Sequence, residues 1–80
     1  MGYTTDVSYA VPRGLTQEQL MQFYRRHLRA WHGVFWTVDG VRLACFDRNG
    51  AVVVVDASGM SGSAQKTYDV TVNHHAPHSD

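Results

Sequence analysis

The chain has 80 residues, which is enough for one domain and too few to support two hydrophobic cores. Hydrophobic residues account for 44% of the sequence and charged residues for 18%, so the composition excludes a disordered chain and predicts a globular one. Seven basic and seven acidic side chains cancel, which excludes the long-range field that draws proteins to nucleic acids or anionic membranes.

An N-terminal strand is predicted over residues 5–11, because apolar and polar side chains alternate there. Pro12 and Gly14 interrupt the alternation and end the strand. The face that we expect to be buried carries Val7, Tyr9 and Val11.

A long helix is predicted from Thr16 to about His32. Thr16 and Gln19 have the spacing of a capping box, in which each side chain binds the backbone N–H of the other residue. Gly33 stands where a left-handed residue would end the helix. Residues at helical spacing form one apolar face of the helix, which we expect to cover a sheet: Leu20, Phe23, Tyr24, His27, Leu28 and Trp31.

From residue 34 onward, apolar side chains recur at every second position, which predicts strands. Asp39-Gly40 lies between two such runs and predicts a two-residue hairpin turn of type I′. This turn fixes a register in which three pairs share one face: Val38 with Val41, Trp36 with Leu43, and Val34 with Cys45. We expect that face to pack against the helix.

The next reversal lies at residues 47–50 and has two interpretations. It is either a four-residue loop or a type I turn with Gly50 in a bulge. The choice decides whether Cys45 faces Val52 or Val53, and the sequence leaves this register open.

Two further strands complete the pattern. Residues 51–55 form a nearly continuous valine run, which predicts a central strand buried on both faces. A Gly/Ser-rich loop is expected over residues 58–65, and residues 67–73 alternate as a half-buried strand does. Residues 75–80 are expected to form a frayed tail.

The order of the elements is strand, helix and then four strands. This order predicts an α+β fold, a two-layer sandwich in which one long helix packs on an antiparallel sheet of four to five strands. We expect a single domain over residues 3–74.

Three segments carry a resemblance to a known kind of domain: residues 23–28 followed by Trp31, residues 46–50 leading into the valine run, and residues 68–72. Over residues 5–74 the chain resembles small helix-plus-meander domains of actinobacterial exported proteins and lipoproteins of unassigned function. The resemblance implies a fold and no activity. Those domains usually follow a lipoprotein leader, which this sequence does not show. We therefore expect a cytoplasmic protein by default, and an extracytoplasmic one if a leader has been removed.

Three histidines near the C-terminus, His74, His75 and His78, are close enough in sequence to suggest a zinc, copper or nickel site. A metal site needs a rigid support, which a terminal tail beside Pro77 does not give. The favoured interpretation is a solvated tail, so we expect no metal and no cofactor.

Cys45 is the only cysteine and cannot form an internal disulfide. A nucleophilic pair with His27 is conceivable, because the strand that holds Cys45 is expected to face the helix. No acidic residue is placed to orient the histidine, and a thiol buried among Val34 and Leu43 is inert. We therefore expect Cys45 to fill a small space in the core, and we do not expect an enzyme.

Arg25, Arg26 and Arg29 line the outer side of the predicted helix. A nucleic-acid site would add basic residues on neighbouring elements and a positive net charge, which this chain lacks. The arginines are therefore interpreted as a solvated helix face, with Arg25 and Arg29 as candidates for docking an acidic partner.

The sheet face away from the helix is expected to carry an apolar patch. Its members are Phe35, Ala44 and Phe46, together with Val53 and Val55 if the turn at residues 47–50 is a four-residue loop. Contiguous exposed patches of this kind mark interfaces. We therefore predict a non-enzymatic protein-interaction module that uses this face to bind a second copy, as a homodimer, or another protein. Neither nucleic acid nor membrane insertion is expected.

A second interpretation is a small-molecule-binding or catalytic domain. Its pocket would lie between the loop at residues 58–65 and the C-terminal end of the helix, where Trp31, Trp36 and His32 would contact a ligand. A concave pocket with converging polar groups would favour this interpretation, whereas a flat apolar sheet face would favour the first.

Overall fold

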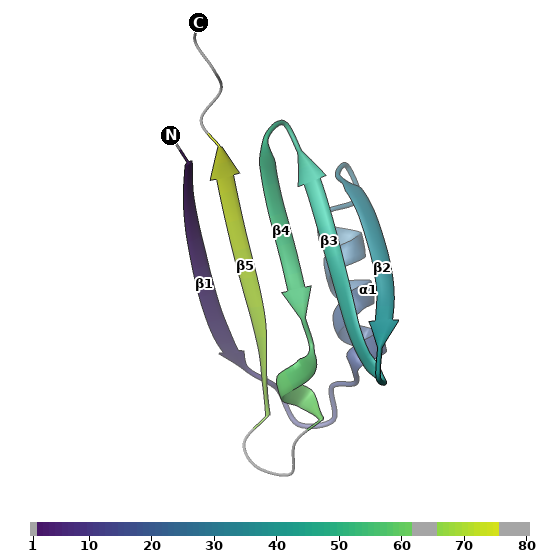
Figure 1. Cartoon of the computed structure of the whole chain (residues 1–80). Helices are drawn as coiled ribbons and strands as arrows, with labels where there is room; N and C mark the ends of the chain where they lie inside the picture. Colours follow the sequence, from purple (N-terminus) through teal and green to yellow (C-terminus); the bar gives the residue numbers. More distant parts are fainter. Residues whose placement is uncertain (1, 62–65, 76–80) are drawn as a thin grey trace, which may run out of the picture.

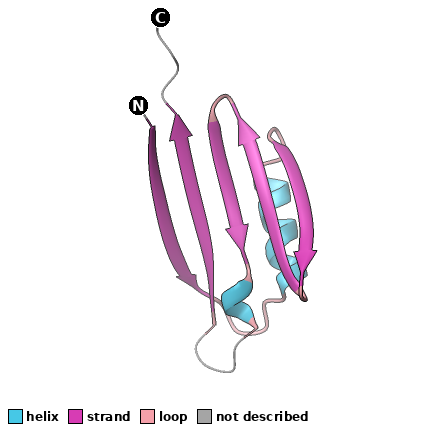
Figure 2. Cartoon of the chain, in the orientation of Figure 1, coloured by secondary structure: helices cyan, strands magenta, loops and turns pink. Residues whose placement is uncertain are grey.

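In the described part of the chain, residues 2–61 and 66–75 of a computed structural model, five strands form one antiparallel sheet (Figure 1). The strand order is β1-β5-β4-β3-β2, and an α-helix packs on one face of the sheet. The elements are β1 (Gly2–Ala10), α1 (Gln17–His27), β2 (His32–Val38), β3 (Val41–Arg48), β4 (Ala51–Asp56), the 3-10 helix η1 (Ser58–Met60) and β5 (Thr67–His75). The predicted α+β class, with one helix on an antiparallel sheet, is confirmed (Figure 2).

A tight turn sets the register of β2 against β3. Asp39 and Gly40 have φ values of 50° and 78°, as a type I′ turn requires, and Val38 pairs with Val41 beside them. The three side-chain pairs predicted for this hairpin are confirmed.

The turn between β3 and β4 differs from both predicted alternatives. Asn49 and Gly50 have φ values of 51° and 82° and form a second two-residue turn. Asn-Gly is itself a preferred type I′ sequence, and it keeps the two preceding residues in the strand. Cys45 consequently lies opposite Val54, and not opposite either of the two expected partners.

Helix α1 begins as predicted and ends earlier. The backbone N–H of Gln19 donates to Thr16 Oγ1 (3.1 Å), and that of Thr16 donates to Gln19 Oε1 (3.0 Å), which completes the capping box. The last helical residue is His27, and β2 already begins at His32, where the helix was expected to end. Within the described residues, no helix is long and apolar enough to cross a membrane.

Gly33 lies inside β2 instead of ending the helix. It pairs with Phe46 of β3, and a Cβ built at position 33 would be 3.1 Å from two atoms of the Phe46 ring. The missing side chain therefore lets the ring approach the sheet closely. The glycine that suggested a helix end marks a close contact between strands.

The helix covers the opposite sheet face from the one predicted. The covered face carries the buried side chains of Ala44, Phe46, Val53, Val55 and Val70. The expected contact residues Val34, Trp36, Leu43 and Cys45 lie on the other face. A two-residue period shows which side chains share a face, but it does not show which face receives the helix.

Helix α1 is also rotated relative to the prediction. Leu20 and Met21 are each 2% exposed, and Tyr24 and Leu28 pack at the edge of the core. Phe23 is 48% exposed, so its expected place in the core was wrong. A helix face centred on the adjacent residues 20 and 21 fits the helical period as well as the predicted helix face does. This face is the one that packs on the sheet.

Tyr24 lies where α1 meets β5, with its ring edge-on to that of Tyr68 and the two centroids 6.3 Å apart. Burial, and after it the neighbouring Tyr68, raises the pKa of the Tyr24 phenol well above its ordinary value of 10.0. The folded chain therefore keeps a proton that the unfolded chain loses.

We expect the free energy of unfolding to decrease as the pH rises above about 10, because only the unfolded state then ionises Tyr24. Below that pH the contribution is fully present. Urea unfolding at a series of alkaline pH values measures the decrease, which should be shallower in Tyr24→Phe. Equal slopes in the parent and the variant would show that another group causes the decrease.

Candidate functional site

The candidate site is the sheet face that α1 does not cover, called the open face below. Figure 1 looks onto this face, with α1 behind β2 and β3. Its side chains alternate along β3 with the buried Ala44 and Phe46, so the open face carries the odd-numbered residues of that strand. Among the residues that the structure describes, no helix lies over it.

Neighbouring side chains on β2, β3 and β4 form an apolar stripe on the open face. The apolar stripe consists of Val34, Trp36, Val38, Val41, Leu43, Cys45, Val52 and Val54. On the edge strand, Val34, Trp36 and Val38 are 48%, 40% and 51% exposed, and the other members are half-buried. A sheet face in contact with water normally carries polar side chains, so the apolar stripe departs from the common pattern.

The same face is polar on β5 and β1. Side-chain hydrogen bonds join the two strands, from Thr4 Oγ1 to Asn73 Oδ1 (3.2 Å), from Thr71 Oγ1 to Asp6 Oδ1 (3.2 Å) and from Ser8 Oγ to Asp69 Oδ1. These strands follow the ordinary polar pattern, so the open face is divided into an apolar part and a polar part.

Carboxylates border the apolar stripe on three sides. At one end, Asp47 Oδ2 lies 3.2 Å from His32 Nδ1, and at the other end Asp39 occupies the turn between β2 and β3. On the side of β5, Asp56 lies directly opposite Asp69.

The residues predicted for an apolar interaction face lie on the covered face. Ala44, Phe46 and Val53 are 0%, 1% and 8% exposed and belong to the core under α1. Phe35 is half-buried beneath Arg25, whose guanidinium carbon lies 4.6 Å from the ring centroid. Their placement away from the helix was wrong, although the face opposite the helix does carry apolar side chains.

Arg25 and Arg29 lie on the helix side of the molecule. Both border a shallow cavity between α1 and β2, together with Trp31 and Phe35. The sheet separates them from the open face, and a role in docking an acidic partner stays a prediction.

The residues of the second interpretation do not converge on one pocket. Residues 58–61 lie at the end of the sheet where α1 begins, and the C-terminal end of α1 lies at the opposite end (Figure 1). Trp36 and His32 belong to the open face of β2, whereas Trp31 lies on the helix side. Residues 62–65 lie outside the described residues.

Cys45 lies half-buried in the apolar stripe, and not in the core as expected. His27 belongs to α1 on the other side of the sheet, where its Nδ1 lies 2.9 Å from the backbone oxygen of Phe23. Because the sheet separates the thiol from the imidazole, the conceivable nucleophilic pair does not form.

Of the three C-terminal histidines, His74 stacks on Tyr3 with ring centroids 5.3 Å apart. The side chain of His75 and the whole of His78 lie outside the described residues. Within the described ranges, no group of three or more His, Cys, Asp or Glu side chains is placed to hold a metal ion.

Comparison of the chain with models of protein families, with curated proteins and with solved structures finds no match. The resemblance to actinobacterial exported domains therefore stays a prediction. A functional assignment rests on the geometry of the open face.

Proposed function

We propose that this chain is a non-enzymatic protein-interaction module that binds its partner through the open face. The observation that supports the proposal is the contrast within that face. Strands β5 and β1 present hydrogen-bonded polar side chains, whereas β2, β3 and β4 present the apolar stripe. An exposed apolar patch with a polar border is typical of a binding surface.

Burial of the exposed side chains of the apolar stripe by a partner would contribute favourable binding free energy. Full burial of a large apolar side chain contributes roughly 1.5–3 kcal/mol. Val34, Trp36 and Val38 keep 48%, 40% and 51% of their surface exposed, so a partner that covered them would gain about half of that amount from each. Trp36 lies in the middle of this row, and tryptophan is among the residues that most often dominate binding at interfaces.

We expect a photoreactive phenylalanine analogue at position 38 to cross-link the chain to its partner in illuminated cells. Val38 is 51% exposed on the open face, and Phe23, 48% exposed on the helix side, gives a matched control position. Trp36→Ser in the position-38 protein should remove most of the cross-linked product, because the partner loses its central apolar contact.

Circular dichroism of each variant checks that the fold is retained. The proposal is contradicted if position 38 yields no product, if positions 23 and 38 yield the same product, or if the product survives Trp36→Ser.

A further inference from the structure

We infer that the partner on the open face is a basic amphipathic helix, with apolar side chains along one side and Lys or Arg at its borders. This inference rests on the proposed function, because it specifies the chemistry of that partner. Two observations support the inference: the distribution of charge over the molecule and the dimensions of the apolar stripe.

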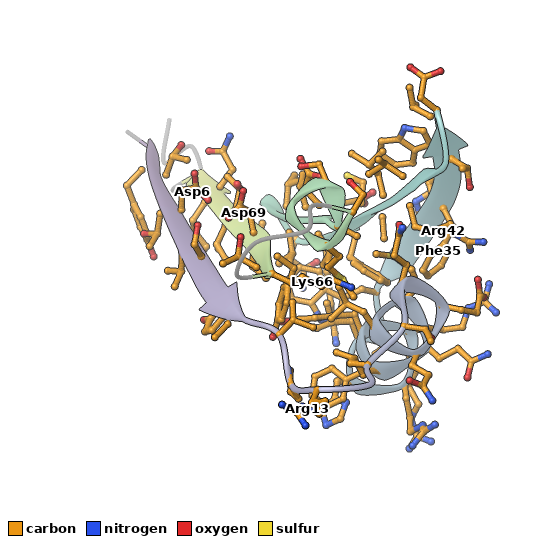
Figure 3. All side chains as sticks on the ribbon, turned by 90° about the horizontal axis from the view of Figure 1, so that it is seen from below. Asp6, Arg13, Phe35, Arg42, Lys66 and Asp69 are labelled. Atoms are coloured by element: carbon orange, nitrogen blue, oxygen red, sulfur yellow. The ribbon has the colours of Figure 1, made fainter. Side chains whose placement is uncertain are left out.

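The sheet separates the two signs of charge. All seven Lys and Arg side chains lie off the open face, on α1, in adjoining loops or on the helix side of β3: Arg13, Arg25, Arg26, Arg29, Arg42, Arg48 and Lys66. The open face carries Asp6, Asp47, Asp56 and Asp69. Figure 3 shows Arg13 and Lys66 on the side of the helix, and Asp6 and Asp69 on the other side. A chain with a net charge of zero therefore presents a negative open face.

The carboxylates beside the apolar stripe, exposed at Asp47 and half-buried at Asp56 and Asp69, each have one protein partner and keep further acceptor positions for a cation. The Asp47 side chain is 56% exposed. Asp56 and Asp69 form a directly opposed pair of like charges, an unfavourable arrangement within a sheet. Asp56 accepts a hydrogen bond from the backbone N–H of Ser58 (2.8 Å), and Asp69 accepts one from Ser8. A Lys or Arg of the partner would relieve the repulsion between the two carboxylates.

A second copy of this chain fits the open face less well than a basic helix does. Pairing of two open faces brings two negative borders together, and like charges across an interface oppose binding. Basic groups on the partner attract the negative border instead and fix the orientation of the complex.

The dimensions of the apolar stripe suit a helix. Three neighbouring strands span about 10 Å, which is close to the diameter of a helix with its side chains, about 10–12 Å. Along β2 the stripe runs from Val34 to Val38, about 13 Å, or roughly two and a half helical turns. On the covered face the sheet already packs against an 11-residue helix, α1.

Trp36 is the reporter for the test, because it lies within the apolar stripe. In Trp31→Phe, Trp36 is the remaining tryptophan, so its fluorescence reports binding at the open face. The probes are three synthetic peptides of about 14 residues. One is an amphipathic leucine–lysine helix, one has glutamate in place of lysine, and one is a scrambled leucine–lysine peptide without an apolar side.

We expect the leucine–lysine helix to shift the Trp36 emission to shorter wavelength and to bind at least about tenfold more tightly than the other two peptides. Asp47→Asn combined with Asp56→Asn should weaken this binding about threefold to tenfold, because two attracting charges are lost while the hydrogen-bond acceptors remain. Glu18→Gln is the matched control, since the Glu18 carboxylate lies on the helix side, 2.8 Å from Arg42, and its loss should leave binding unchanged.

Val34→Ser combined with Val38→Ser separates two kinds of failure. If this variant binds every peptide as the parent does, the peptides do not bind at the open face, and if no peptide changes the Trp36 emission, a helix is not the partner. Either result overturns the inference, whereas the proposed function fails only if the cross-linked product at position 38 is absent as well. If the variant weakens binding but the glutamate peptide binds as tightly as the lysine peptide, or if the double Asn variant binds normally, only the inference of a basic partner is overturned. A dimer of the parent chain that Trp36→Ser dissociates in sedimentation would also overturn it, with a second copy as the partner.

Discussion

Phe46→Ala is expected to lower the free energy of unfolding by about 3–5 kcal/mol. The Phe46 ring is 1% exposed, lies over Gly33 and packs edge-on against Phe35 with the ring centroids 5.4 Å apart. Its removal leaves a cavity between α1 and the sheet that paired strands cannot close. A chain of this size has a total stability on the order of 4–12 kcal/mol, so the variant loses a large part of it.

Phe23→Ala is the matched control for this substitution. Its side chain is 48% exposed, and we expect a cost below about 1 kcal/mol. Urea unfolding followed by circular dichroism measures both variants. A similar cost for the two substitutions would mean that α1 faces the sheet through Phe23 and that the core is assigned wrongly.

The hairpins of this fold are predictable from sequence because their determinants are local. Asp39-Gly40 and Asn49-Gly50 are dipeptides that favour positive φ at both positions, and in the structure both form two-residue turns. The first was recognised from the sequence. The second was missed because residues 47 and 48 were assigned to the loop, although strand pairing continues through Arg48.

The choice of the covered face depends on long-range packing, which the local pattern does not contain. Along β2 and β3, the open face is the more continuously apolar one, whereas the covered face includes Thr37, Arg42 and Arg48 at its borders. Counting apolar residues therefore selects the wrong face. The pairing of Gly33 with Phe46 is the better signal, since an aromatic ring opposite a glycine can fold over it.

The prediction of the candidate site contained the same error, because the two faces of the sheet were assigned the wrong way round. An apolar face opposite the helix was predicted, but Phe35 and Phe46 were assigned to it in place of Val34, Trp36 and Val38. The negative charge of the open face was missed for the same reason. The net charge of the sequence is zero, so the separation of acidic and basic side chains onto opposite faces is visible only after each strand residue has been assigned to a face.

Gly59→Ala is expected to lower the free energy of unfolding by about 2–3 kcal/mol, although it adds a single methyl group. Gly59 lies in η1, and a Cβ built there would be 2.5 Å from the backbone oxygen of Thr67 and 2.6 Å from Thr67 Oγ1. The hydroxyl can rotate away, but the backbone oxygen belongs to the first residue of β5, so relief of the contact requires η1 to move away from that strand. Such a movement would also disturb Met60, which is 6% exposed in the core.

Ser58→Ala is the matched control for Gly59→Ala, because it lies in the same turn and is exposed. Its backbone N–H still donates to Asp56 Oδ1 after the substitution, so we expect a change within about 0.5 kcal/mol. Thermal and urea unfolding of the two variants measure the difference. If Gly59→Ala is as stable as Ser58→Ala, then η1 does not pack closely against the start of β5, and the contact between Gly59 and Thr67 carries no structural role.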